Sequence, residues 1–344
     1  MEKANPLVSF IIPVYNVPTA MLRECLESIL ALSLRPFERE IIIVDDGSEC
    51  SMVNGQCSMV NGQCSMDNGQ CSMVNELGAL ADDVLYIRQR NSGVSVARNV
   101  GLRMATGRFI QFVDGDDLLL QAPYEHVLDQ LRYQQSCDMV LFDFAKTREV
   151  PLLYDDHGPM TGGEMLRREN IHGSVWGYVF SRNILGSLHF TPGVNYGEDE
   201  EFTPQLLLRA ESAIRTTAQA YFYRERTTSA TGIGTTRSNL RRLSDTQSVI
   251  MRLKKLADRM PTADRVAMQR RTAQLTMDYI YNVIVMTRSS HYLERKIGEL
   301  SKAGLFPLPN RDYTTKYTWF RRMTNSRVGR TVLLRTLPLM ERER

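Results

Sequence analysis

Short apolar runs alternate with amphipathic stretches over the first part of the chain. Four runs are rich in β-branched and aromatic residues and are short enough for buried strands: 8–12, 40–44, 84–87 and 108–113. Apolar residues at helical spacing occupy 19–32 and 94–105, and Thr19 is expected to cap the first of these helices. Strands that alternate with helices predict an α/β fold with a mostly parallel sheet and right-handed crossovers.

The pattern becomes helical after residue 235. Three segments carry apolar residues at helical spacing: 239–258, 262–287 and 291–302. Pro261 and the prolines at 307 and 309 separate them. We therefore expect one domain at 1–235 and a helical C-terminal region at 236–344.

Residues 50–75 form a tandem repeat of the unit CSMVNGQ. Each unit contains Asn-Gly, which favours a turn, and only Met and Val supply apolar surface, so a coiled coil is not expected. Cysteines seven residues apart without histidine are a poor zinc pattern. The repeat is interpreted as a flexible surface loop inserted after the second strand.

Composition fits a soluble globular protein. Of the 344 residues, 43% are hydrophobic and 24% are charged, and the longest apolar runs fall far short of a membrane span. The N-terminus resembles no signal peptide, and only Cys25 and Cys137 lie outside the repeat, so a reduced cytoplasmic protein is expected.

Charge is distributed unevenly. Residues 241–344 hold 22 Lys and Arg against 9 Asp and Glu, a net charge of +13, so the rest of the chain carries −10. In the last part, aromatic residues at 313, 317, 319 and 320 lie beside Arg321 and Arg322. A basic region of this kind predicts an anionic partner, for which we favour a membrane surface over nucleic acid. The alternative is a helical lid with a solvated basic face.

Carboxylates follow the apolar run at 109–113 directly. Asp114, Asp116 and Asp117 surround one glycine, where an open α/β sheet binds its ligands. Two carboxylates about 4 Å apart repel by roughly 4 kcal/mol at an effective dielectric of 20. Oxygen ligands suit Mg²⁺ or Mn²⁺, so Asp114 and Asp116 are candidates to hold a metal together with a diphosphate. A solvated turn is the alternative.

A second acid pair, Asp45 and Asp46, ends the run at 40–44. If the two strands are adjacent, both acid pairs face one crevice, and this first pair could bind a base or ribose. Between them, residues 91–99 form a loop that enters a helix, whose N-terminus favours anions, and Arg98 adds a positive charge.

Further candidates lie between residues 170 and 230. Glu198 and Asp199 begin a helix, where one carboxylate could act as a general base, although acids are also common helix caps. Arg224 and Arg226 follow a strand and could meet a diphosphate or an acceptor, or could form a solvated edge.

In this order the motifs resemble glycosyltransferase family 2. The motifs are IIPVYN at 11–16, VDDGS at 44–48, NSG and ARNVGL within 91–102, FVDGDD at 112–117 and GED at 197–199. The resemblance covers roughly residues 7–230. It implies a GT-A fold, a nucleotide-sugar donor, Mn²⁺ or Mg²⁺, inversion at the anomeric carbon and a role in bacterial surface polysaccharide synthesis.

The resemblance also implies roles for individual residues. Asp199 becomes the base, with Glu198 beside it, and Asp116 binds the metal with Asp114 near the ribose. The donor-binding set is Pro13, Tyr15, Asp45, Asp46, Asn91, Gly93, Arg98 and Asp114. Trp176, Arg224 and Arg226 are the candidates for acceptor or diphosphate contacts. Tyr178 stands where lysine is common in the family, which leaves acceptor contacts there open.

These features predict an inverting glycosyltransferase that moves a sugar from a nucleotide sugar to a glycan or lipid-linked acceptor. A UDP-sugar is the expected donor, and the enzyme is expected in the cytoplasm, peripherally at the inner face of the cell membrane. The alternatives are a nucleotidyltransferase and an inactive nucleotide-sugar-binding scaffold.

Overall fold

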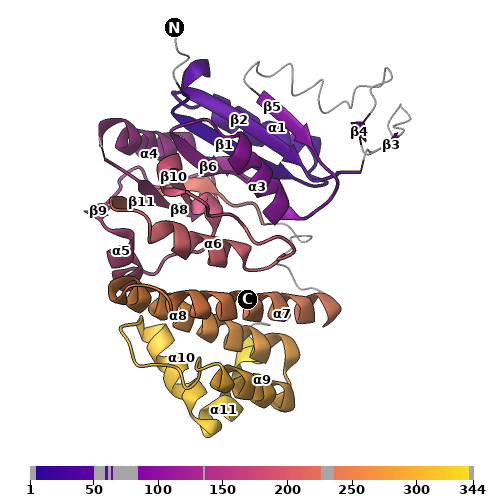
Figure 1. Ribbon diagram of the computed structural model, residues 1–344, viewed down its shortest axis with the longest axis vertical. Helices are drawn as coiled ribbons and strands as arrows, with labels where there is room; N and C mark the ends of the chain where they lie inside the picture. The colour runs from indigo at the N-terminus through magenta and orange to yellow at the C-terminus, as the bar shows by residue number, and fades with distance from the viewer. Residues whose placement is uncertain are drawn as a thin grey trace. The chain divides into compact units, whose positions relative to one another are not determined.

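A computed structural model describes residues 5–49, 59–60, 63–64, 84–134, 136–225 and 236–340. The chain divides into two compact units (Figure 1). The sheet unit holds residues 1–162 and 172–226, and the helical unit holds 163–171 and 227–344. Residues 163–171 thus belong to the helical unit although they lie well before the boundary expected near residue 235.

One mixed sheet of nine strands forms the centre of the sheet unit (Figure 1). The strand order is β5–β2–β1–β6–β10–β8–β11–β7, and β9 pairs with β11. The strands β5, β2, β1 and β6 are parallel, whereas β10, β7 and β9 run antiparallel to their neighbours. Their bounds are β1 (Val8–Val14), β2 (Arg39–Asp45), β5 (Val84–Arg88), β6 (Phe109–Phe112), β7 (Leu118–Leu119), β8 (Met139–Ala145), β9 (Asp156–Met160), β10 (Tyr178–Ser181) and β11 (Ala213–Phe222).

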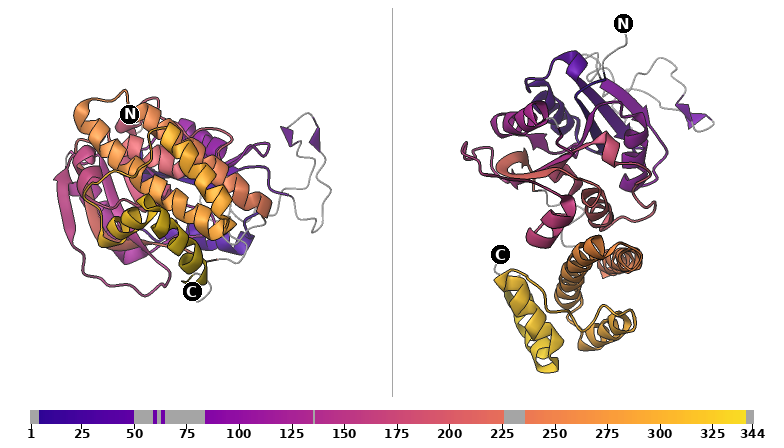
Figure 2. Two further views of the ribbon diagram at one scale, coloured as in Figure 1. Left: turned by 90° about the horizontal axis from the view of Figure 1, so that it is seen from below. Right: turned by 60° about the vertical axis from the view of Figure 1, so that its left-hand side comes forward.

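Helices cover both faces of this sheet (Figures 1 and 2). They are α1 (Thr19–Leu30), α3 (Val94–Met104), α4 (Gln121–Tyr133) and α6 (Glu198–Leu207), while α5 (Gly162–Arg168) leads into the helical unit. Phe10 of β1 shares a buried core with α1 and α4. The next residue, Ile11, points the other way, toward Gly101 of α3.

Two expectations about this unit need correction. The residue at the N-cap position of α1 is Pro18, and no side chain caps the helix, so the expected capping role of Thr19 is wrong. The first acid pair follows β2 and the second follows β6, but β1 lies between those two strands, so they are not adjacent.

Only part of the repeat at 50–75 is described. Two short strands in it, β3 (Met59–Val60) and β4 (Gln63–Cys64), pair with each other in a separate two-stranded sheet. The other residues of the repeat, and with them its expected flexible-loop character, lie outside the described residues.

Five helices make up most of the helical unit: α7 (Thr236–Ala257), α8 (Thr262–Thr287), α9 (Ser290–Lys302), α10 (Thr315–Asn325) and α11 (Arg327–Met340) (Figure 2). The first three match the predicted segments closely, whereas α10 and α11 were not predicted. Buried Arg270 of α8 donates to the carbonyl oxygens of Leu166 and Glu169, which ties 163–171 to this unit. No helix in the described ranges is long and apolar enough to cross a membrane.

Candidate active site

The carboxyl ends of β2, β1 and β6 lie at one edge of the sheet because these strands are parallel. Asp45 is the last residue of β2, and the segment 113–117 follows β6. Both acid groups therefore lie at the edge where open α/β sheets bind ligands, with the end of β1 between them.

Both carboxylates of the first pair already bind the protein. Asp45 accepts hydrogen bonds from the Ser48 amide (2.8 Å) and the Tyr86 hydroxyl (2.6 Å). Asp46 accepts from the amides of Ser92 and Gly93, each at 2.8 Å. Asp46 thus fastens the loop at 91–93 to the end of β2, while Asp45 holds Ser48 and Tyr86.

Four other candidate donor-binding residues lie on or near this edge. Pro13 is a half-buried residue of β1, and Tyr15, just beyond that strand, is 50% exposed. Asn91 is exposed, and Gly93 has a φ of 90° at the N-cap of α3, a conformation that favours glycine. Their contacts with a nucleotide stay a prediction.

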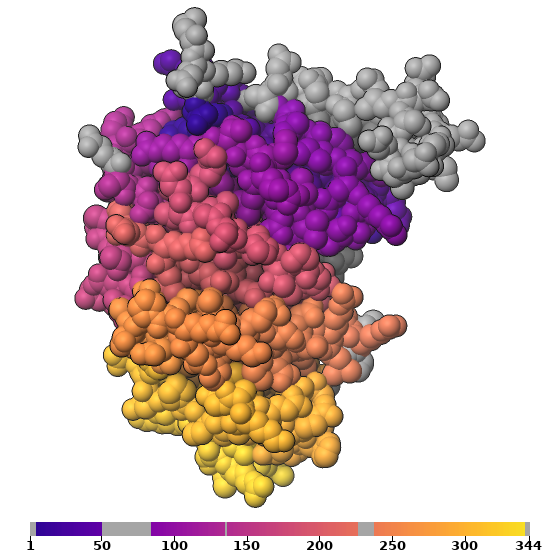
Figure 3. All heavy atoms as spheres, in the orientation of Figure 1, coloured from indigo at the N-terminus to yellow at the C-terminus, as the bar shows by residue number. Residues whose placement is uncertain are grey.

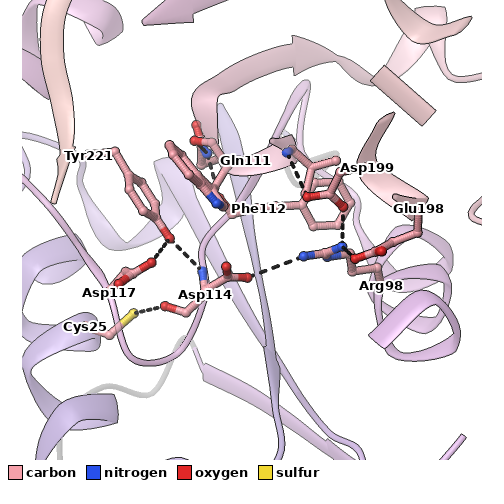
Figure 4. A network of polar contacts seen from close by, with 11 residues as sticks. Cys25, Arg98, Gln111, Phe112, Asp114, Asp117, Glu198, Asp199 and Tyr221 are labelled. Carbon is pink, nitrogen blue, oxygen red and sulfur yellow. Dashed lines mark hydrogen bonds and ion pairs between the residues drawn. The ribbon is translucent and has the colours of Figure 1, made fainter. Parts of the chain in front are cut away.

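Tyr221 of β11 positions the turn after β6 (Figure 4). The Asp114 amide donates to the Tyr221 hydroxyl oxygen at 3.0 Å, and that hydroxyl donates to Asp117 at 2.9 Å. Burial, with the nearby charge of Asp114, raises the pKa of the Asp117 carboxyl to about 7. The buried Asp117 side chain therefore holds the turn together through its hydrogen bond, whereas Asp114 and Asp116 remain partly exposed.

Arg224 braces the same turn from the end of β11. Its amide donates to Asp117 (2.8 Å), and its Nε donates to the Asp116 carbonyl oxygen (2.9 Å). Its Nη2 binds Glu24 of α1 at 3.0 Å. Hydrogen bonds from Arg224 and then Arg148 lower the pKa of Glu24. A role of Arg224 toward diphosphate or acceptor stays a prediction, and Arg226 lies outside the described residues.

Arg98 links the turn after β6 to the start of α6 (Figure 4). One guanidinium nitrogen contacts Asp199 at 2.5 Å and Glu198 at 3.1 Å, and the other contacts Asp114 at 3.5 Å. Arg98 is 4% exposed. Arg98, a member of the predicted donor-binding set, therefore lies among the acids, and its contact with a donor stays a prediction.

Aromatic packing explains how α6 comes to this position. Phe202 of α6 stacks on Phe190 with ring centroids 4.1 Å apart, and it also contacts Phe112, the last residue of β6. Gly197 adopts a left-handed conformation, φ 85°, at the N-cap of α6. Together these features hold Glu198 and Asp199 beside the end of β6.

The acids outnumber the single arginine. Burial raises the pKa values of Glu198 and Asp199, although Arg98 opposes this effect. Burial disfavours the charge on Arg98, but the attraction of Asp199, Asp114 and Glu198 holds its pKa above the usual range. With all three carboxylates ionised, this cluster would carry an excess of negative charge, which favours a bound proton or cation.

The residues at the end of β6 fit a divalent metal that is shared with a ligand. No group of three or more His, Cys, Asp and Glu side chains within the described ranges is placed to hold a metal. Mg²⁺, however, commonly uses only one or two carboxylates plus substrate phosphates. Asp114, with a side chain 31% exposed, and half-buried Asp116 suit that requirement beside the excess negative charge.

Aromatic residues next to the turn include the predicted acceptor residue Trp176. Its ring stacks on Tyr221 at 4.4 Å between centroids and on Tyr223 at 5.9 Å, and Trp176 is 8% exposed. Tyr178 is fully buried in β10 and shares a hydrogen bond with Thr203, so it takes part in packing rather than in acceptor contacts. An acceptor contact by Trp176 stays a prediction.

Sequence reasoning missed how Tyr221 and Glu24 support the site. Neither residue is among the candidate site residues that the sequence indicates. Their partners are 107 and 200 residues away in the sequence. No local pattern reports such contacts, although a buried tyrosine near an acid cluster generally needs a hydrogen-bond partner.

Comparisons with known proteins identify a family of glycosyltransferases as similar to this chain. The sequence profile described as "Glycosyl transferase family 2" matches residues 9–53 and 66–185, so the unmatched residues 54–65 fall inside the repeat. A protein called "Uncharacterized glycosyltransferase EpsJ" from Bacillus subtilis is 29% identical over 66% of this chain and 64% of its own length. "Minor teichoic acid biosynthesis protein GgaB" from the same organism is 25% identical over 67% of this chain and 24% of its own length. The matched region thus spans less than two thirds of either relative.

A solved structure shares the fold. The crystal structure of S. aureus TarS 1–349 in complex with UDP-GlcNAc superposes with a TM-score of 0.61 at 17% identity, covering 98% of this chain and 91% of that one. The expected fold, a GT-A mixed sheet flanked by helices with a helical C-terminal region, is therefore confirmed.

Proposed function

We propose, from the premise that the chain belongs to glycosyl transferase family 2, that it moves a sugar from a nucleotide-sugar donor to a hydroxyl group with inversion. One observation carries this proposal. Arg98 joins Asp199, the candidate base, to Asp114, a candidate ligand of the donor and its metal. The candidate base and the candidate ligand of the donor and its metal therefore lie close together.

Asp199 is the proposed general base. It takes the proton from an acceptor hydroxyl while the hydroxyl oxygen bonds to the anomeric carbon and the nucleoside diphosphate departs from the opposite face. Burial raises its pKa, which makes its carboxylate a stronger base than a solvent-exposed aspartate. Arg98 and the Val175 amide, 3.4 Å from Asp199, orient the carboxylate.

A divalent cation, Mn²⁺ or Mg²⁺, would be held by Asp116 and Asp114 together with the donor diphosphate. When bound, it supplies Lewis-acid stabilisation of the negative charge on the leaving diphosphate. Tyr221 and Arg224 keep the turn that carries both carboxylates in place, so that the ligands are oriented before the donor arrives.

The proposed donor is a UDP-sugar, and the proposed acceptor is a glycan or lipid-linked intermediate of surface polysaccharide synthesis. The UDP-GlcNAc bound by TarS supports the donor class, and the teichoic acid role of GgaB supports the acceptor class. A lipid-linked acceptor places the enzyme at the cytoplasmic face of the membrane, and the +13 net charge of residues 241–344 suits peripheral binding there.

A screen of nucleotide sugars for hydrolysis, with and without Mn²⁺, tests the proposal. We expect slow metal-dependent release of the nucleoside diphosphate from one donor, and faster release with an acceptor. Pyrophosphate released from a nucleoside triphosphate would indicate a nucleotidyltransferase. Donor binding with no turnover under any condition would indicate a scaffold.

A further inference from the structure

Helix α11 has an inner side that is fully used in packing. Its residues Leu333 and Leu337 are buried. Arg330 on the same side is 7% exposed and binds Glu294 of α9 at 2.7 and 2.9 Å. These contacts fix which side of the helix turns away from the rest of the helical unit.

The opposite side of α11 is apolar and exposed. Val328 is 74% exposed, Val332 is 42% exposed and Leu339 is 61% exposed. These residues, together with exposed Arg335, are spaced by four, three and four positions, so they form one stripe on the helix. Figure 2 shows α11 (yellow) at the outside of the helical unit.

Helix α10 packs against α11 and also exposes basic and apolar residues. Lys316, Trp319 and Arg322 are exposed at spacings of three residues, and Trp319 is 51% exposed. Its other aromatic residues point inward: Tyr317 donates to Asp278 at 2.9 Å, and Phe320 contacts Tyr281. Of the aromatic residues grouped in the sequence, the structure therefore exposes Trp319 while Tyr317 and Phe320 pack inside.

Two arginines on these exposed stripes, Arg322 and Arg335, form no ion pair with any residue that the structure describes, in contrast to Arg330. We call the following exposed residues of the contacting helices α10 and α11 the basic–apolar face: Lys316, Trp319, Arg322, Val328, Val332, Arg335 and Leu339. The space-filling view shows α10 and α11, in yellow, at the surface of the helical unit (Figure 3).

We propose that the basic–apolar face docks on an anionic lipid bilayer. Docking through this face is the proposed form of the membrane association in the proposed function, and the proposal rests on that function. Trp favours the membrane–water interface, and an amphipathic helix can bury its apolar side at the boundary between headgroups and acyl chains. Unpaired arginines beside that side attract anionic headgroups.

A lipid surface suits this face better than a second copy of the chain. In a twofold dimer the same patch lies on both sides of the interface, so Arg322 and Arg335 would meet an equally basic surface. Like charges that face each other across an interface oppose association. A negatively charged bilayer is instead complementary to this face.

Co-sedimentation of the full chain with vesicles tests the proposal. We expect binding to phosphatidylcholine mixed with phosphatidylglycerol, much weaker binding to phosphatidylcholine alone, and loss of binding as salt rises. Equal binding to both vesicles, or none to the anionic ones, would overturn the proposal. So would a dimer in analytical ultracentrifugation that the variants below dissociate.

Matched charge variants locate the surface. Each basic residue near an anionic surface contributes a factor of about five, so Arg322→Glu with Arg335→Glu should weaken vesicle binding about 25-fold or more. Lys255→Glu in the last turn of α7 with Arg259→Glu just after that helix makes the same charge change at exposed positions, and this variant should lose much less vesicle binding. Equal losses for the two pairs would show that total charge, rather than this face, attracts the membrane.

A third variant tests the apolar stripe. Val328→Ser with Val332→Ser and Leu339→Ser keeps every charge and should also weaken binding, whereas unchanged binding would contradict insertion. Donor hydrolysis in solution should be the same in all these variants. Failure of vesicle binding with normal hydrolysis would reject only the docking surface, while absence of hydrolysis in the unchanged protein would reject the proposed enzyme.

Discussion

Arg98 determines how the charged groups of the candidate site are arranged. Its guanidinium contacts carboxylates from two segments, the turn after β6 and the start of α6. A planar guanidinium can bind several carboxylate oxygens at fixed angles, which a lysine ammonium cannot. We therefore propose that Arg98 positions Asp199, while the donor contact expected from the sequence stays a prediction.

Arg98→Lys separates these two roles. If Arg98 orients the base, kcat should fall by about 100-fold, because small misplacements of catalytic groups can cost that much. The KM for the donor should change little, since the positive charge is kept. Steady-state kinetics with varied donor measures both values. A large rise in KM with kcat preserved would instead assign Arg98 to the diphosphate.

Asp116→Ala tests the metal site. The variant should lose transfer and the metal-dependent part of donor binding while its circular dichroism stays unchanged, because the Asp116 side chain is partly exposed. Titration of nucleotide sugar with and without Mn²⁺ measures this. Asp129→Ala, at an exposed position of α4, is the control and should behave like the unchanged protein. Full activity of Asp116→Ala would show that the reaction does not need a metal bound by Asp116.

At the residue scale the sequence predicts which acids belong to the site but not how they are paired. Acids at strand ends and helix starts are local patterns, and Arg98 contacts three of these candidates, Asp114, Glu198 and Asp199. The contact between Arg98 and Asp199 joins residues 101 positions apart, and it depends on how α3 and α6 pack. Only the folded chain shows that pairing.

Among the elements, α3 is packed closely on β1. A Cβ atom at Gly101 would lie 2.2 Å from Cγ2 of fully buried Ile11. Gly101→Ala should therefore destabilise the sheet unit by about 1–3 kcal/mol, the usual cost of overpacking. Urea unfolding followed by circular dichroism measures it.

Gly298→Ala on α9 is the matched control. A Cβ at Gly298 meets no atom within 4 Å, so the substitution should stabilise its helix by up to about 1 kcal/mol. Equal effects of the two glycine substitutions would show that the contact with Ile11 does not constrain α3.

The repeat should be dispensable for folding. Deleting residues 57–70 removes two whole units, and β3 and β4 within them pair only with each other. Loop closure changes by only about 0.6 kcal/mol for each doubling of length, so the melting temperature should barely move. A loss of many degrees in differential scanning calorimetry would show that the repeat packs on the sheet unit.

Whether a segment forms a helix or a strand was easier to predict than which elements lie next to it. The runs at 8–12 and 40–44 indicate strands because β-branched residues cluster there, yet nothing in them shows that β1 lies between β2 and β6. Helices α10 and α11 were missed since exposed apolar residues such as Val328 and Val332 blur the helical pattern. Those same residues form the proposed docking surface.

At the scale of the whole molecule, charge divides between the two units. The candidate catalytic acids lie in the sheet unit, while residues 241–344 carry a net charge of +13. A negatively charged catalytic site needs a cation to bind a diphosphate, and a basic helical unit suits an anionic surface. The charge imbalance is visible in the sequence, but which basic residues are unpaired is not.

The central claim is that Asp199 is the base of a glycosyl transfer reaction. The most direct test measures kcat and the donor Kd of the full chain carrying Asp199→Asn, beside Glu198→Gln as the comparison. We predict that Asp199→Asn lowers kcat by at least about 100-fold, the usual contribution of a general base, while the donor Kd stays unchanged. Glu198→Gln should cost less. Substantial turnover by Asp199→Asn, together with a collapse of turnover in Glu198→Gln, would contradict the account.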